Sequence, residues 1–296
     1  MFIRAIAIAL AAFAALLSFG PAHAAPDIAC TRYEPVGTGP DVILVPGLGS
    51  SPAVWDGTIA ALSDRFRLHR VAVPGFAGEP PEEDIDESLP QDIPSRTAQT
   101  IADYIACRGL DRPAIVGHSM GGLTGLIVAS EHPDSIGRLV VIDALPFYPL
   151  IFDPAATEHS VAPQAATFAQ TIRSADDASF AQMQMRAAAS LAQSPDHAAM
   201  IADWTLASDR ETFASAMQSV MTSDLRPALP GIAIPVTIVY ATNHVATPDR
   251  AKTLYEGAYS SLPDVKFVPI ADSYHFTMLD QPETTIRAIE DALKAK

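Results

Sequence analysis

Short runs rich in valine and isoleucine recur along the chain and alternate with longer stretches of helical spacing. The apolar runs are 42–45, 68–73, 114–116, 139–142, 236–240 and 265–268. They lack the in-out alternation of a half-exposed strand, which is typical of parallel strands covered on both faces. The stretches 97–107, 123–131 and 282–295 between and after them contain good helix formers at helical spacing. This order predicts an α/β fold with a mostly parallel, doubly wound sheet.

One segment breaks this rhythm. Residues 148–226 contain no strand-like run and are dominated by alanine, glutamine and methionine, so we expect an inserted all-helical cap between two core segments, 25–147 and 227–296. Helix starts are predicted at Ser174, Ser194 and Ser208, the last with Glu211 placed for a capping box. The segment also carries five of the eight methionines, which suit a deformable wall over a ligand pocket or simply the core of a helical unit.

The first residues form a three-part pattern. Arg4 precedes an apolar run, 5–17, and Ala22-His23-Ala24 fits a small-x-small cleavage site. We therefore expect a secretory signal peptide over residues 1–24, cleaved after Ala24, and a secreted or periplasmic protein. The run is shorter than the roughly 20 residues that span a bilayer, so no stable membrane anchor is expected after cleavage.

The excess of acidic residues makes anionic binding partners unfavourable. Lysine and arginine number 19 against 34 aspartates and glutamates, which gives a formal net charge of −15. Such a surface repels phosphate backbones and anionic membranes, so nucleic acid is not an expected partner. Segment 79–95 concentrates acidic residues and prolines and predicts an irregular, solvated loop, with a gate at the pocket mouth as the alternative.

The chain has two cysteines, Cys30 and Cys107. In an oxidising compartment an even pair favours a disulfide, which would stabilise the fold by about 4 kcal/mol in the chain-entropy model. Two buried thiols are the alternative. Neither cysteine has a histidine or another cysteine at metal-ligand spacing, so we expect no metal or cofactor.

The strongest chemical signal is the pentapeptide Gly117-His118-Ser119-Met120-Gly121. It stands between the apolar run 114–116 and the helical stretch 123–131, the context of a nucleophile elbow. The glycines let strand and helix approach closely, and the helix N-terminus favours developing negative charge. We therefore predict that Ser119 is a nucleophile.

These features together resemble the α/β-hydrolase superfamily, of the alpha/beta-hydrolase-1 type with a helical cap. The resemblance covers essentially all of the chain after residue 24 and includes Pro46-Gly47-Leu48-Gly49 and a late histidine in "DSYHFTMLDQP". It implies that His275 is the general base and that the amides of Leu48 and Met120 form the oxyanion hole. Family members often have His-Gly where this chain has Pro46-Gly47, which removes a side chain that often supports that loop.

The resemblance also implies a catalytic triad of serine, histidine and an acid that orients the histidine. Which residue is the acid is the undecided part of the site. The family commonly reads Gly-x-x-Asp after the strand at 236–240, but the matching residues 241–244 end in His244, which we expect at the pocket rim. We favour Asp143, because it ends the strand that precedes the cap and open α/β sheets build their sites at such ends. Asp249 is the alternative acid, although its Thr-Pro-Asp context is typical of a helix cap. Asp272, Asp280 or no acid remain open as well.

The sequence thus predicts a serine hydrolase that cleaves a carboxylic ester through an acyl-enzyme and acts on a small, hydrophobic, ester-like substrate. The same residues could serve a lactone, an amide, a thioester or a carbon–carbon bond, since fold alone does not choose between them. A ligand-binding protein with little turnover is the alternative from another class.

Overall fold

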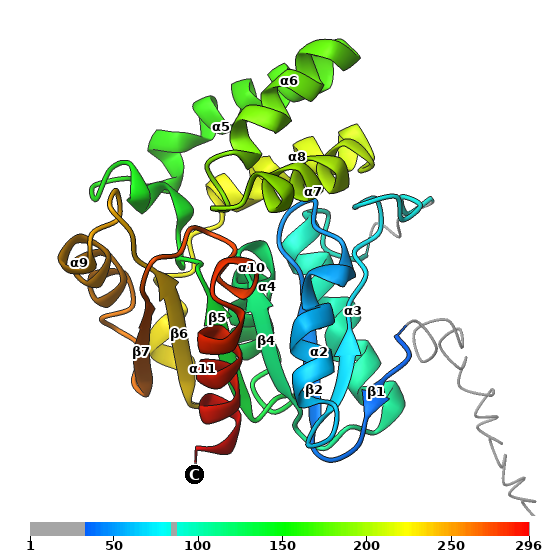
Figure 1. The fold of residues 1–296 in the computed structure, drawn as a ribbon, viewed down its shortest axis with the longest axis vertical. Coiled ribbons are helices and arrows are strands. Elements are labelled where there is room, and N and C mark those ends of the chain that lie inside the picture. The colour runs from blue at the N-terminus through cyan, green and yellow to red at the C-terminus, as the bar shows by residue number, and fades with distance from the viewer. Residues whose placement is uncertain (1–32, 84–87, 296) are drawn as a thin grey trace, which may run out of the picture.

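The computed structural model describes residues 33–83 and 88–295 (Figure 1). Within them one sheet is formed by seven strands: β1 (Val36–Gly37), β2 (Asp41–Val45), β3 (Arg67–Arg70), β4 (Ala114–His118), β5 (Arg138–Ile142), β6 (Val236–Ala241) and β7 (Val265–Ile270). The spatial order is β1-β3-β2-β4-β5-β6-β7. Only the short β1 pairs antiparallel, with β3; every other neighbouring pair is parallel. The predicted fold class, a mostly parallel doubly wound sheet, is confirmed.

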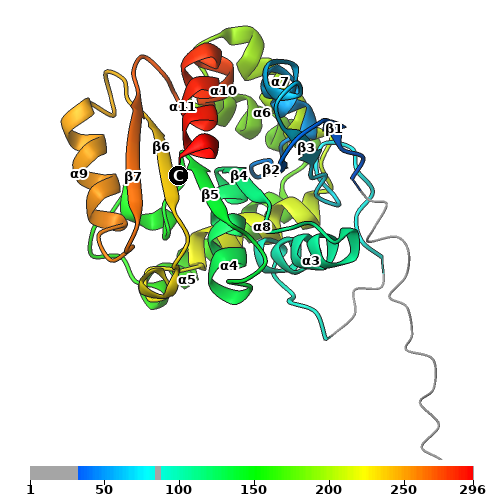
Figure 2. The same ribbon diagram turned by 90° about the horizontal axis from the view of Figure 1, so that it is seen from below.

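Both faces of the sheet are covered. Val42 and Leu44 of β2 point into one core with α2 (Asp56–Leu62) and α11 (Pro282–Lys294). Ile43 and Val45 point into the other core, with α3 (Ile93–Arg108), α4 (Met120–Glu131) and α9 (Pro248–Ala258). Figure 2 shows α11 and α4 on opposite sides of the strands. Successive strand residues are therefore both buried, which explains apolar runs without alternation.

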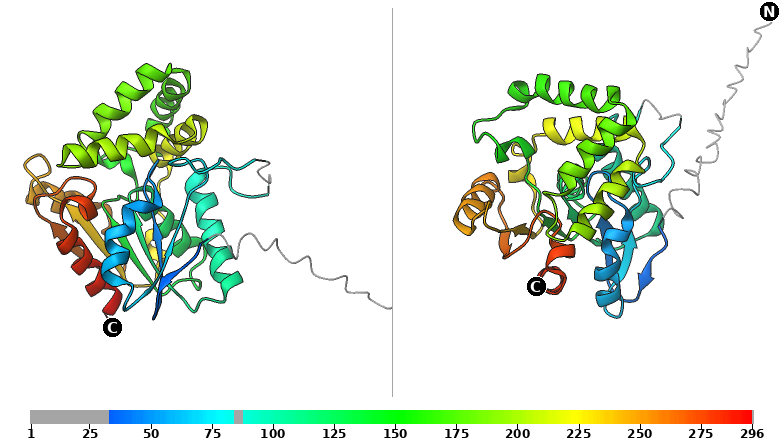
Figure 3. Two further views of the ribbon diagram at one scale, coloured as in Figure 1. Left: turned by 45° about the vertical axis from the view of Figure 1, so that its right-hand side comes forward. Right: turned by 45° about the horizontal axis from the view of Figure 1, so that its top comes forward.

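The inserted segment is helical throughout its regular structure, as predicted. Between β5 and β6 the chain forms η2 (Tyr148–Ile151), α5 (Glu158–Ser174), α6 (Asp177–Ala188), α7 (Pro195–Leu206), α8 (Arg210–Thr222) and η3 (Leu229–Gly231). Helix α5 packs against α8 and α6 against α7. Together they cover the end of the sheet toward which the parallel strands point (Figures 1 and 3).

Two of the three predicted helix starts in the cap are wrong. Ser174 is the last residue of α5, and α6 is capped by Asp176, whose carboxylate accepts the amide of Ser179. Helix α8 is capped by Asp209, and Glu211 binds Arg173 and completes no capping box. In both cases an aspartate one or two residues after the serine is the cap, because its charged carboxylate makes charge-assisted hydrogen bonds and is favourable at a helix N-terminus. Ser194 does precede α7, but its side chain makes no capping hydrogen bond.

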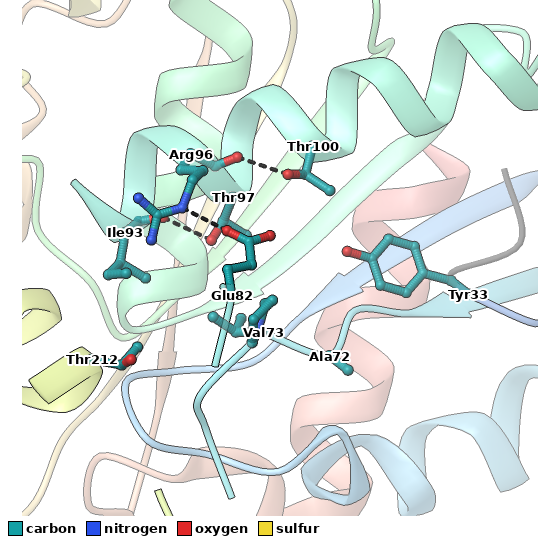
Figure 4. A pocket seen from close by; sticks show the side chains of 10 residues that line it. Tyr33, Ala72, Val73, Glu82, Ile93, Arg96, Thr97, Thr100 and Thr212 are labelled. Carbon is teal, nitrogen blue, oxygen red and sulfur yellow. Dashed lines mark hydrogen bonds and ion pairs between the residues drawn. The ribbon is translucent and has the colours of Figure 1, made fainter. Parts of the chain in front are cut away.

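The predicted signal peptide and Cys30 lie outside the described residues, so the signal peptide, its cleavage and the disulfide stay predictions; Cys107 lies on α3. No helix in the described ranges is long and apolar enough to cross a membrane. Part of the acidic segment is anchored to the core, because Glu82 forms a 2.8 Å ion pair with Arg96 in α3 beside a hollow of about 40 Å³ (Figure 4).

Candidate active site

Ser119 lies at a strained turn between β4 and α4. Its φ of 54° and ψ of −120° are a backbone conformation that residues other than glycine rarely adopt. The turn is held because the Ser119 amide donates to Ile142 O at 2.9 Å, and its carbonyl accepts from the amides of Gly122 and Leu123. The neighbouring structure therefore imposes the strain that presents the serine at the end of the sheet.

The glycines of the pentapeptide are required by close backbone contacts. A Cβ atom added at Gly117 would lie 2.6 Å from the Gly122 amide nitrogen, and one at Gly121 would lie 2.7 Å from Pro46 O. Gly47 faces the serine directly, because its added Cβ would lie 3.1 Å from Ser119 Cβ. The turn after β2 and the start of α4 are therefore packed backbone to backbone around Ser119.

Asp143 and His275 are brought together from opposite sides of the cap insertion. Asp143 follows β5, and His275 lies between β7 and α10 (Thr277–Asp280). His275 Nδ1 lies 2.7 Å from Asp143 Oδ2, and both side chains are mostly buried. A carboxylate that accepts the Nδ1 proton leaves Nε2 unprotonated and able to accept a proton from a nucleophile.

A tyrosine that sequence reasoning did not single out holds the same carboxylate. Asp143 Oδ1 accepts the hydroxyl of Tyr255, in α9, at 2.9 Å and the backbone amide of Ala241 at 2.9 Å. Burial, followed by the nearby charge of Asp143, raises the pKa of Tyr255 well above its usual value of 10.0, so the hydroxyl stays protonated and donates. Three donors therefore fix the orientation of the Asp143 carboxylate.

We expect Tyr255→Phe to lower kcat about tenfold, because a hydrogen bond to a charged group contributes about 1.5–3 kcal/mol. Without this donor the Asp143 carboxylate is held by two donors instead of three, so it orients the His275 ring less firmly. Tyr259→Phe is the matched control, because its buried hydroxyl donates at 2.9 Å to Ala144 O instead. An equal loss of kcat and of stability in both variants would reduce Tyr255 to a structural role.

His118 is a neutral, fully buried neighbour of the site. Its Nε2 lies 3.0 Å from the carbonyl oxygen of His275, so Nε2 carries the proton and donates. Its Nδ1 has no hydrogen-bond partner among the described residues. Burial, and then the adjacent His275 ring, lowers the pKa of His118 well below 6.5. His118 therefore ties the His275 loop to the end of β4 and stays uncharged.

This burial predicts a loss of stability on acidification. Below pH 6.5 His118 is protonated in the unfolded chain but stays neutral in the folded protein, because its pKa is lower there. The unfolded state therefore binds more protons, and the free energy of unfolding falls as pH falls. The contribution is at most about 1.4 kcal/mol per pH unit. Urea unfolding between pH 7 and 5 should show a shallower decline for His118→Gln than for the parent, whereas replacing the exposed His159 should not change it. Parallel slopes for all three proteins would contradict this assignment.

The two amides expected to bind an oxyanion are free in the described structure. Neither the Leu48 nor the Met120 N–H has a hydrogen-bond acceptor among the described residues. The Met120 amide is one of the free donors in the first turn of α4, where the helix dipole favours negative charge. Leu48 follows Gly47, which faces Ser119. Two unpaired donors thus flank the serine from separate elements.

The other candidate acids and His244 lie elsewhere. Asp249 is exposed in the first turn of α9. The Asp280 carboxylate accepts the amides of Gln193 and Tyr274, and Asp272 is exposed at a positive φ of 50°. His244 is exposed, and its ring packs edge-on against the ring of Tyr274, with 6.2 Å between the ring centroids. No hydrogen bond or ion pair joins any of them to His275 in the described part of the chain.

A cavity of about 340 Å³ is bordered by Asp143 and His275 and by Gly47, the residue that faces Ser119. Gly47, Leu48, His118, Asp143 and His275 line it from the sheet, and the cap contributes most of the apolar wall, including Leu191, Ile201, Phe213, Met217 and Val220. The volume is at the low end for small-molecule sites. Within residues 33–83 and 88–295 no three histidine, cysteine, aspartate or glutamate side chains are grouped so that they could hold a metal ion.

Comparisons with known proteins agree with this fold. Residues 40–282 match the family model described as alpha/beta hydrolase fold. The chain belongs to this family, and the protein is an α/β-fold hydrolase. Among its relatives, the pimeloyl-[acyl-carrier protein] methyl ester esterase of Nitrosomonas europaea is 26% identical over 276 residues, which cover 89% of this chain and 99% of that protein.

Solved structures share the fold at lower identity. A hydrolase from Oleispira antarctica superimposes with a TM-score of 0.75 at 15% identity and covers 92% of this chain and 97% of its own. The enol-lactonase from Burkholderia xenovorans LB400 gives 0.66 at 22% identity, over 89% and 96%. At this level of identity these structures show the fold and do not assign an activity to this chain.

Proposed function

We propose that the protein is a serine esterase that cleaves a carboxylic ester through an acyl-enzyme. Ser119 attacks the carbonyl carbon while His275 Nε2 takes its proton, and Asp143 stabilises the imidazolium that forms. The amides of Leu48 and Met120 donate to the oxyanion of the tetrahedral intermediate. His275 then gives its proton to the leaving alcohol, and water, activated by the same histidine, releases the acid.

The observation that carries this proposal is the 2.7 Å hydrogen bond between His275 and Asp143 beside the strained Ser119 turn. A histidine oriented by a mostly buried carboxylate, a serine at a strained turn and two free amides form the arrangement that acyl transfer needs. Ser119 Oγ makes no hydrogen bond among the described residues. Catalytic hydrogen bonds are often long in ligand-free enzymes and shorten when substrate binds.

The proposed substrate is a small ester with a hydrophobic acyl or alcohol part. Support comes from the mostly apolar cavity and from the esterase activity that the Nitrosomonas relative's name records, on a methyl ester. Desolvation in such a cavity favours apolar chains over charged or sugar groups. Hydrolysis confined to charged or sugar esters in a survey of p-nitrophenyl esters would overturn this part of the proposal.

Covalent labelling tests the nucleophile. A fluorophosphonate should modify Ser119 in the folded protein, because the probe mimics the tetrahedral intermediate and its oxygen meets the two free amides. Mass spectrometry of the labelled peptide identifies the residue. Ser130→Ala, which changes a serine in the same helix far along α4, should label like the parent, and Ser119→Ala should not label. Labelling at another residue, or none in the folded parent, would refute the proposal.

We also propose that the protein is exported and that Cys30 and Cys107 pair. The pattern in residues 1–24 supports export, and an oxidising compartment supports the pairing of an even number of cysteines. N-terminal sequencing of the exported protein should begin at Ala25, and thiol titration under denaturing conditions should find no free cysteine. Retention of the first 24 residues would contradict the export proposal.

A further inference from the structure

Gln184 places a side-chain amide in the mostly apolar cap wall of the cavity. Gln184 lies on α6 and is only 7% exposed. It lines the cavity together with Ala187 and Ala188, which follow it on α6 at spacings of three and four residues, and with Leu191, which follows the helix end. Residues at these spacings lie along one face of a helix. The amide of Gln184 therefore lies beside small apolar side chains on the helix face that lines the cavity.

The side-chain amide of Gln184 has no hydrogen-bond partner among the described residues. Burial of an unpaired amide is unfavourable, so a group in this position normally has a partner in the protein, in water or in a ligand. Gln184 is part of the cavity lining, so a group held in the cavity can supply such a partner.

We propose that Gln184 selects substrates whose chain carries one neutral oxygen group, a keto, hydroxyl or second ester group, at a distance from the scissile bond. This inference rests on the proposed esterase function. The amide NH₂ donates to a carbonyl or hydroxyl oxygen, and the amide oxygen can accept from a hydroxyl. The rest of the chain packs against the apolar wall, so Gln184 sets the position of the oxygen along the chain.

The charges around the cavity favour a neutral group over a carboxylate. Its lining includes the carboxylate of Asp143 and, within the described residues, no lysine or arginine. A second carboxylate would have to leave water without a cation to pair with and would meet the negative charge of Asp143. A neutral oxygen gains the hydrogen bond without that cost.

Matched esters test the proposal. The substrates are p-nitrophenyl octanoate and its mono-keto analogues, with the keto group moved one carbon at a time along the acyl chain. For the best-placed analogue, we expect Gln184→Met to lower the ratio of kcat/KM for the keto ester to that for the octanoate by about five- to tenfold, the contribution of one neutral hydrogen bond. Gln184→Leu should give the same loss, so the test survives if one variant folds poorly.

Gln182→Met is the matched control, because Gln182 is exposed on the same helix two residues earlier. It should leave the ratio unchanged. An unchanged ratio in both Gln184 variants, with hydrolysis of keto and plain esters affected equally, would overturn the inference. Fluorophosphonate labelling of Ser119 in the same samples separates the two proposals: if Ser119 labels normally and the ratio does not move, only the role of Gln184 fails.

Discussion

Asp143→Asn should lower kcat about 10³- to 10⁴-fold, because the substitution reverses the hydrogen bond to His275. The Ala241 amide and the Tyr255 hydroxyl both donate to Oδ1 of the native carboxylate. In the variant these donors should hold the amide oxygen of residue 143, so its NH₂ group faces His275 Nδ1. Nδ1 must then accept, the proton moves to Nε2, and His275 can no longer take the proton of Ser119.

Asp249→Asn is the control for this experiment. Asp249 is exposed in α9, so its variant should keep kcat within about twofold of the parent. Both are measured on one short-chain p-nitrophenyl ester, with thermal unfolding recorded to separate lost catalysis from lost structure. Near-normal turnover in Asp143→Asn together with a large loss in Asp249→Asn would show that Asp249, and not Asp143, is the acid that orients His275.

The sequence located the catalytic candidates because each stands where a strand ends. The carboxyl ends of parallel strands meet at one edge of a sheet, so Ser119 after β4, Asp143 after β5 and His275 after β7 could be expected close together. The loop after β6 could not be interpreted in the same way. Its Asn243 side chain accepts the amides of Val245 and Ala246, which closes a local turn and leaves His244 exposed.

Tyr255 was missed although part of its signal is in the sequence. Ala251, Tyr255 and Tyr259 recur every four residues and predict a buried face of one helix, and a buried tyrosine hydroxyl usually finds a hydrogen-bond partner. The partner is set by how α9 crosses the sheet, which spacing within one helix does not determine. The same limit applies to Gln184, because a polar residue in a helical segment is assigned to the solvent side until the cavity it faces is known.

The helix starts in the cap show a limit of another kind. Several residues near each start can accept the free amides of a first turn, and the sequence does not rank them well when an aspartate lies one or two positions from a serine. Ser208 instead donates to Trp204 O and accepts the Ala77 amide, so it joins the cap to the core. Local patterns therefore identified the helices of the cap better than their first residues.

Gly121→Ala should destabilise the protein by about 3 kcal/mol or more, because the added methyl group would overlap backbone atoms. At this position Cβ would lie 2.7 Å from both Pro46 O and Val45 C, and a backbone cannot rotate away as a side chain can. Relief would require α4 to move from the end of β2. That movement would displace the amides of Met120 and Leu48 relative to Ser119, and a misplacement of about 1 Å can cost about 100-fold in rate.

Gly257→Ala provides the control for this change. Gly257 lies in α9, and nothing lies within 4 Å of its added Cβ. The alanine should stabilise the protein by up to about 1 kcal/mol, since it is the better helix former. Urea unfolding gives the two free energies, and kcat/KM on a short-chain ester at a temperature where both variants are folded gives the catalytic effect. If Gly121→Ala unfolds like the parent and keeps full activity, the turn after β2 can yield, and the close packing of β2 against α4 does not position the oxyanion donors.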